Sequence, residues 1–174
     1  MREGPMSAKA SCQCGRVEAT IAGKPILHAI CYCESCRTAG LAFAHAPNAP
    51  SVVGGDGGTD FLVYRKDRVG RFTGGDLLRE HRLKSDAPTR RIVATCCNTP
   101  MFLDFTKGHW LSLYAARLSG EIPPVDMRVM TADRPEGPPL PDDVPNYTTH
   151  SPRFMAKLFA AWAAMGFRRP NIVW

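Results

Sequence analysis

The seven cysteines of this chain fall into three short groups. The groups are Cys12-Gln13-Cys14-Gly15, Cys31-Tyr32-Cys33-Glu34-Ser35-Cys36 and Cys96-Cys97, the last followed by Asn98-Thr99-Pro100. Cysteines separated by one or two residues are too constrained to pair with one another as ordinary structural disulfides. They do place their sulfurs on one side of a tight turn, where a zinc ion lies about 2.3 Å from each ligand. Sulfur ligands favour zinc or an iron–sulfur cluster, whereas buried free thiols, the alternative, usually occur singly.

The number of ligands separates two sites. Cys31, Cys33 and Cys36 supply three thiolates, and three protein ligands leave one position of a zinc ion open for chemistry. The other four cysteines could supply a second, closed site that joins the amino end to the chain near residue 97. They are Cys12, Cys14, Cys96 and Cys97. Gly15 fits the tight turn that such a site requires.

In order and spacing these groups resemble the glutathione-dependent formaldehyde-activating enzyme (GFA) family, which has the β-rich, zinc-binding Mss4-like fold. The similarity covers roughly residues 10 to 105 and includes Arg37 and Gly40 after the second cysteine group. It implies a catalytic zinc and a structural zinc. The implied ligands are Cys31, Cys33 and Cys36 for the catalytic ion, and Cys12, Cys14 and Cys97 for the structural one.

The third motif departs from the family pattern C-x-x-C-G-T-P. Its first cysteine would fall at Ala94, and Asn98 replaces the glycine. Neighbouring side chains on a strand point to opposite faces, so Cys96 can join Cys97 on one metal only if the backbone turns between them. Either Cys96 is the fourth ligand or the structural site has been lost. The turn residues Asn98 and Pro100 favour a zinc that recruits Cys96.

The resemblance implies a zinc-dependent carbon–sulfur lyase that adds the thiolate of glutathione to formaldehyde and forms S-hydroxymethylglutathione. An open zinc–thiolate site can accept such a small thiol and lower its pKa. Arg37, beside the second cysteine group, is the expected contact for a carboxylate of glutathione. The residues themselves identify neither formaldehyde nor glutathione.

A non-enzymatic zinc-binding module for protein or nucleic acid is the alternative, because one fold can carry many functions. The net charge of +6 suits anionic ligands, but no block of five like charges occurs. Arg90-Arg91 and Arg168-Arg169 are isolated pairs, which disfavours nucleic acid. The histidines lie outside ligand spacing and are expected to be structural or exposed: His28, His45, His81, His109 and His150.

Short alternating runs bounded by glycine and aspartate predict a mainly β domain. The expected strands lie near residues 17–21, 26–30, 61–64, 69–73, 81–83, 92–95, 101–105 and 110–114. We expect one domain over residues 1–174, with its β core at about 10–118. A content of 44% hydrophobic and 22% charged residues excludes a disordered or collagen-like chain.

A proline-rich strap is expected over residues 121–150, because prolines cannot donate to a β ladder. Ser151 and Pro152 are suited to begin a helix, predicted over residues 152–166. Phe154, Leu158, Trp162 and Met165 then form one apolar stripe. This stripe is expected to pack on the β core or on a second copy of the chain.

The opening residues show no signal peptide, and the longest apolar run is about half a membrane span. An odd number of cysteines excludes a complete set of internal disulfides. We therefore expect a cytoplasmic protein with no membrane partner, since clustered thiols in a reducing compartment usually hold metal.

Overall fold

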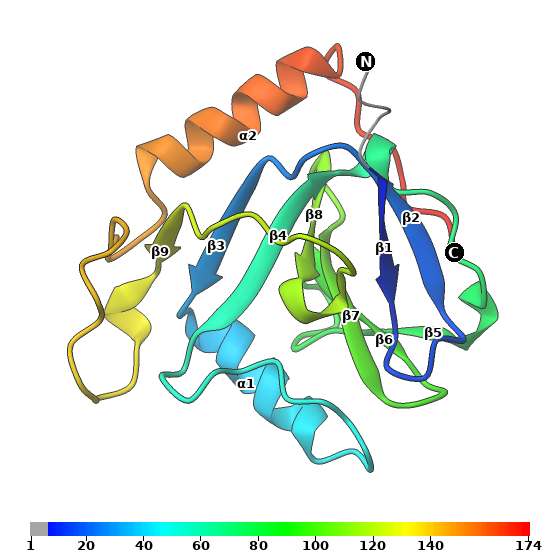
Figure 1. The fold of residues 1–174 in the computed structure, drawn as a ribbon, viewed down its shortest axis with the longest axis horizontal. Coiled ribbons are helices and arrows are strands. Elements are labelled where there is room, and N and C mark those ends of the chain that lie inside the picture. Colours follow the sequence, from blue (N-terminus) through cyan, green and yellow to red (C-terminus); the bar gives the residue numbers. More distant parts are fainter. Residues whose placement is uncertain (1–6) are drawn as a thin grey trace.

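A seven-stranded sheet forms the centre of the computed structural model, which describes residues 7–174 (Figure 1). The strand order is β5-β6-β7-β8-β4-β3-β9, and only β3 and β9 pair in parallel. The bounds are β3 (Leu27–Cys31), β4 (Thr59–Arg65), β5 (Leu78–His81), β6 (Thr89–Ala94), β7 (Thr99–Phe105), β8 (Trp110–Tyr114) and β9 (Met127–Val129). The expected mainly β fold is therefore confirmed.

A two-stranded hairpin covers one face of this sheet. It consists of β1 (Ser7–Ser11) and β2 (Glu18–Ala22), which pair antiparallel. Its side chains pack with those of the large sheet into the main hydrophobic core, where Ile21, Leu62 and Phe102 are fully buried. Because side chains alternate along a strand, Phe61 and Val63 must point to the opposite face.

Two helices border that opposite face. The first, α1 (Glu34–Ala44), begins three residues after β3 ends, and the second, α2 (Pro152–Ala164), follows the proline-rich segment. Figure 1 shows α1 (cyan) and α2 (orange) at opposite ends of β3 and β4. Neither helix is long and apolar enough to span a membrane, and residues 7–174 contain no other candidate.

The predicted carboxyl-terminal helix is confirmed, together with its capping residues. The Ser151 hydroxyl accepts a hydrogen bond from the Phe154 amide at 2.9 Å, and Pro152 occupies the first turn. Leu158 of α2 is buried in a second apolar cluster with Leu27, Ala29, Val63, Met127 and Val129. The helix therefore packs on the β core, as the apolar stripe predicts.

Truncating Leu158 tests how much this packing contributes to stability. Leu158 is 3% exposed, whereas its neighbour Phe159 is 60% exposed. We expect Leu158→Ala to lower the free energy of unfolding by about 2–4 kcal/mol, since it leaves a cavity under α2. Phe159→Ala should change it by about 0.5 kcal/mol or less. Urea unfolding of both variants measures the difference, and equal values would contradict the proposed packing.

Some expected elements are displaced or absent. Residues 69–73 were expected to form a strand, but they make only isolated bridges to β2, at Val69 and Thr73. The strand expected at 81–83 lies earlier, at β5. The strap is irregular except at β9, which pairs with β3 across a large sequence separation, and at a short 3-10 turn, Thr131–Asp133. Only three residues long and close to Pro123 and Pro124, β9 carries no local strand signal.

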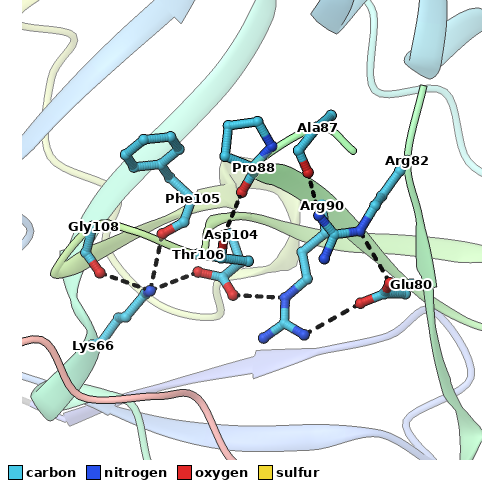
Figure 2. A network of polar contacts seen from close by, with 10 residues as sticks. All are labelled: Lys66, Glu80, Arg82, Ala87, Pro88, Arg90, Asp104, Phe105, Thr106 and Gly108. Atoms are coloured by element: carbon cyan, nitrogen blue, oxygen red, sulfur yellow. Dashed lines mark hydrogen bonds and ion pairs between the residues drawn. The ribbon is translucent and has the colours of Figure 1, made fainter. Parts of the chain in front are cut away.

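A buried ion pair joins the residue that follows β4 to β7 on the hairpin side of the sheet (Figure 2). Lys66 Nζ lies 2.8 Å from Asp104 Oδ1, and both side chains are 1% exposed. The same ammonium donates to the carbonyls of Phe105 and Gly108, while Arg90 Nε donates to Asp104 Oδ2 at 2.8 Å. Each buried charge is therefore compensated, which a buried ion requires.

Removing one partner of this ion pair is expected to lower the free energy of unfolding by more than the intact pair contributes to it. In Lys66→Met the carboxylate of Asp104 keeps only Arg90, the Gly108 carbonyl loses its donor, and the Phe105 carbonyl keeps only the Gly108 amide. We expect the free energy of unfolding to fall by about 3–5 kcal/mol. Lys107→Met, at an exposed position nearby, is the control and should be nearly neutral. A loss below about 1 kcal/mol for Lys66→Met would contradict this account.

Candidate metal centre

The first candidate ligand set lies where β3 ends and α1 begins. Cys31 is the last residue of β3, Cys33 caps α1, and Cys36 lies in the first helical turn. Their sulfurs lie within 4.8 Å of one another. We call these three residues the tri-cysteine cluster. A strand that turns directly into a helix thus brings together ligands that are only five positions apart.

The start of α1 favours negative charge on these sulfurs. The Cys36 amide donates to Cys33 Sγ at 3.4 Å, and the helix dipole places positive potential at this end. Hydrogen bonds from Cys31 and Cys36 lower the pKa of the Cys33 thiol well below its usual range. Cys31 donates hydrogen bonds to Cys33 and Cys36. These bonds, together with burial, raise the pKa of the Cys31 thiol. The surroundings therefore favour negative charge on Cys33 over Cys31.

Four other cysteines form a second set, here called the four-cysteine cluster: Cys12, Cys14, Cys96 and Cys97. Cys12 and Cys14 lie in the turn of the β1–β2 hairpin, where Gly15 has a φ of +76°. The other two lie in the turn between β6 and β7. Hydrogen bonds from the Arg16 backbone and side chain lower the pKa of Cys14 to about 6.

The sulfur separations in the four-cysteine cluster fit a tetrahedral metal ion. Cys12 Sγ lies 3.6 Å from Cys14 Sγ and 3.8 Å from Cys96 Sγ, and Cys14 and Cys96 are 3.4 Å apart. Cys96 and Cys97 sulfurs are separated by 3.8 Å. A tetrahedron with zinc–sulfur bonds near 2.3 Å has edges of about 3.8 Å. No cysteine within residues 7–174 forms a disulfide, so every sulfur remains available.

The position of Cys96 depends on a turn that replaces the family motif. Ala94, where the family has a cysteine, is the last residue of β6 and is fully buried in the core. The backbone turns over residues 95–98, with the Cys97 amide donating to the Ala94 carbonyl, and Asn98 takes a φ of +52°. Asparagine tolerates this left-handed conformation better than most residues. The turn brings Cys96 and Cys97 together, as the sequence prediction requires.

A cavity of about 420 Å³ adjoins the tri-cysteine cluster and not the four-cysteine cluster. Its floor is the helix-side face of the large sheet, with residues from β3, β4, β6, β7, β8 and β9. The start of α1 and the start of α2 form its walls. One cluster therefore opens onto a space for a ligand, whereas four sulfurs of the other already complete a tetrahedron.

Two polar residues of this cavity carry no signal in the sequence. Arg91 of β6 is 2% exposed, and its Nη2 donates to the Ser35 carbonyl at 3.0 Å. His150, just before α2, lies at the rim with its ring 5.3 Å from that of Phe154. Only the strand register, which places Arg91 beside Leu103, brings the arginine to the tri-cysteine cluster.

Arg37, the expected contact for glutathione, does not line this cavity. Its Nη1 donates to the Asp133 carbonyl at 2.7 Å and so ties α1 to the segment after β9. A role for Arg37 in substrate binding therefore stays a prediction. Among the other histidines, His28 is buried against Asp60 and the Pro123 carbonyl, and His109 stacks on Trp162. Neither belongs to a cysteine cluster.

Comparisons with known proteins agree with the cysteine pattern. The family described as glutathione-dependent formaldehyde-activating enzyme matches residues 7–114, more than half of the 174 residues and all seven cysteines. No curated protein matches the chain. Among solved structures, the crystal structure of a Rhodobacter sphaeroides structural-genomics target is 16% identical, with a TM-score of 0.45. That similarity covers 79% of this chain and 98% of the other. On the match over residues 7–114, this chain belongs to the glutathione-dependent formaldehyde-activating enzyme family.

Proposed function

We propose that this protein is a zinc-dependent carbon–sulfur lyase that adds the thiol of glutathione to formaldehyde and forms S-hydroxymethylglutathione. The observation that carries the proposal is the cavity that opens onto the tri-cysteine cluster. In this proposal Cys31, Cys33 and Cys36 hold the catalytic zinc. The four-cysteine cluster holds a structural zinc that joins the hairpin to the β6–β7 turn.

A zinc ion held by three thiolates offers a free position and lowers the pKa of a thiol bound there. The protein's own residues would favour the resulting negative charge. The amino end of α1 points at the cluster, and the buried Arg91 guanidinium lies against the first turn of that helix. Apolar walls exclude water, which strengthens these electrostatic interactions. The thiol sulfur then bonds to the carbonyl carbon, and the thiol proton ends on the carbonyl oxygen.

A measurement of metal content and exchange rate tests the proposal. Elemental analysis should find about two zinc ions per chain, one for each cluster. Magnetisation-exchange NMR should show that catalytic amounts of protein accelerate interconversion of formaldehyde, glutathione and S-hydroxymethylglutathione above the spontaneous rate. A zinc-loaded protein that leaves this rate unchanged would contradict the enzyme proposal and favour a non-enzymatic zinc-binding module. Free thiols at both clusters are compatible with the reducing cytoplasm, which we propose as the compartment.

A further inference from the structure

The cavity beside the tri-cysteine cluster is much larger than formaldehyde requires. Its volume is about 420 Å³. A water molecule occupies roughly 30 Å³ of liquid, and formaldehyde, with two heavy atoms, is of similar scale. A reactant of that size would leave most of the cavity to solvent. The volume instead suits a molecule of about ten heavy atoms.

Most of the cavity wall is apolar, and much of it is aromatic. Phe61, Leu103, Phe105 and Trp110 come from the sheet, and Phe154 and Leu158 come from α2. Such a surface gains free energy by covering apolar ligand atoms, and it gives polar atoms no hydrogen-bond partners. The wall therefore selects for an apolar ligand body.

The charges of the cavity do not match those of glutathione, which carries two carboxylates and an ammonium group. Arg91 is the one Lys or Arg that lines the cavity, and no Asp or Glu lines it within residues 7–174. Arg91 and, at the exposed rim, His150 could each pair with a carboxylate, but the ammonium group would find no acidic partner among the lining residues and would lie against apolar side chains at a cost. The peptide part of glutathione therefore belongs outside the cavity, which leaves the space to the carbonyl reactant.

Arg91 places a positive charge at the cavity wall, close to the tri-cysteine cluster. Its Nη2 is held by the Ser35 carbonyl, between Cys33 and Cys36 in sequence. Its guanidinium lines the cavity, so its positive charge lies near a ligand oxygen bound there. Such a charge would stabilise negative charge that develops on the oxygen during addition.

We propose that the cavity takes a carbonyl compound with an aromatic or branched aliphatic body, whose oxygen lies towards the positive charge of Arg91. This inference rests on the thiol addition proposed above: the reaction is the same, and formaldehyde becomes the smallest of the aldehydes that the site accepts. The thiol sulfur bonds to the aldehyde carbon, the π electron pair of the carbonyl moves to oxygen, and the thiol proton joins that oxygen. The product is a hemithioacetal, and the reaction requires no oxidant or reductant.

A series of aldehydes tests the preference with the zinc-loaded protein and glutathione. Exchange NMR gives kcat/KM above the spontaneous rate for formaldehyde, propanal, butanal, pentanal and phenylacetaldehyde. We expect kcat/KM to rise about fourfold for each buried methylene group. Glycolaldehyde, which matches propanal in size but ends in a hydroxyl, is the polar control and should be about tenfold poorer than propanal.

Binding of an unreactive carbonyl compound gives a readout that does not depend on catalysis. Phenylacetamide should bind to the wild type in calorimetric titration, and acetamide should not bind detectably. Ser112→Phe fills the floor of the cavity and should abolish phenylacetamide binding, with Ser112→Leu as a smaller alternative. Arg91→Lys, which keeps a charge but loses the planar guanidinium held by Ser35, should weaken binding about tenfold. Ser85→Phe, at an exposed turn, is the matched control and should bind normally.

The outcomes separate this inference from the proposed function. Acceleration with formaldehyde, no preference for longer aldehydes and no binding of phenylacetamide would overturn the inference and leave the proposed function intact. Acceleration with no aldehyde, in a protein that holds two zinc ions, would overturn the proposed function and the reaction inferred here. If phenylacetamide binding were equal in wild type and Ser112→Phe, the cavity would not be the site, and the inference would be wrong.

Discussion

Replacing Cys33 with serine is expected to remove one of about two zinc ions per chain and to abolish catalysis. Cys33 contributes one of three sulfurs to the tri-cysteine cluster, and no other candidate ligand of residues 7–174 belongs to that cluster. A neutral hydroxyl is a poor ligand for zinc compared with a thiolate. Loss of the zinc should lower kcat/KM at least about a thousandfold, which corresponds to about 4 kcal/mol of transition-state stabilisation.

Serine at position 33 also separates metal binding from folding. Cys33 caps α1, and its sulfur accepts a hydrogen bond from the Cys36 amide. Serine is a good capping residue, so Cys33→Ser should keep the helix, whereas Cys33→Ala should lose about a further 1 kcal/mol of stability. Elemental analysis and thermal unfolding of both variants measure the two effects. If Cys33→Ser retained two zinc ions and normal exchange rates, the tri-cysteine site would be wrong.

The sequence predicts this cluster well because its ligands are local. Cys31, Cys33 and Cys36 lie within six residues, so one strand-to-helix turn is enough to bring them together. The four-cysteine cluster needs two distant turns, and in the sequence only the number of remaining cysteines and the family resemblance relate them. The structure confirms that the hairpin turn and the β6–β7 turn lie together.

The cavity could not be predicted in the same way, because its residues come from six strands and two helices. Arg91 sits in a strand whose alternation is readable, but the sequence does not say which strands are its neighbours. Register places Arg91 opposite Leu103, and Leu103 opposite Ser112, across β6, β7 and β8. Short strands cannot be predicted from the sequence for a related reason. The three-residue strand β9 forms only because it can pair with the edge of β3.

The electrostatic difference between the two clusters follows from their surroundings. Arg16 donates to the Cys96 carbonyl and lies beside Cys14, so the four-cysteine cluster has a cationic neighbour on the outer surface of the hairpin. The tri-cysteine cluster has a buried one, Arg91, on its cavity side. Arg16 therefore balances the negative charge of the four-cysteine cluster on a side where no cavity adjoins it. Arg91 balances the charge of the tri-cysteine cluster on the side where a substrate would lie.

Replacing Cys96 with serine is expected to destabilise the fold more than any other substitution considered. Cys96 Sγ lies within 3.8 Å of the sulfurs of Cys12, Cys14 and Cys97, so it contacts all three other members of its cluster. A structural zinc contributes about 10–16 kcal/mol in small zinc-finger peptides. This domain has its own core and should lose less, about 5 kcal/mol. For a chain of this length that loss lowers the melting temperature by roughly 10–20 °C.

The controls for Cys96→Ser distinguish a lost ligand from a damaged turn. Thr95→Ser changes the preceding residue but keeps the hydroxyl that donates to the Leu77 carbonyl, so it should melt like the wild type. Cys96→Ser should keep one zinc ion, at the tri-cysteine cluster, and should still accelerate the exchange reaction at low temperature. Suppose instead that Cys96→Ser melts normally and that the wild type holds a single zinc ion. Then Cys12, Cys14 and Cys97 would no longer form a metal site, because the change from cysteine to Ala94 would have removed a ligand that Cys96 does not replace.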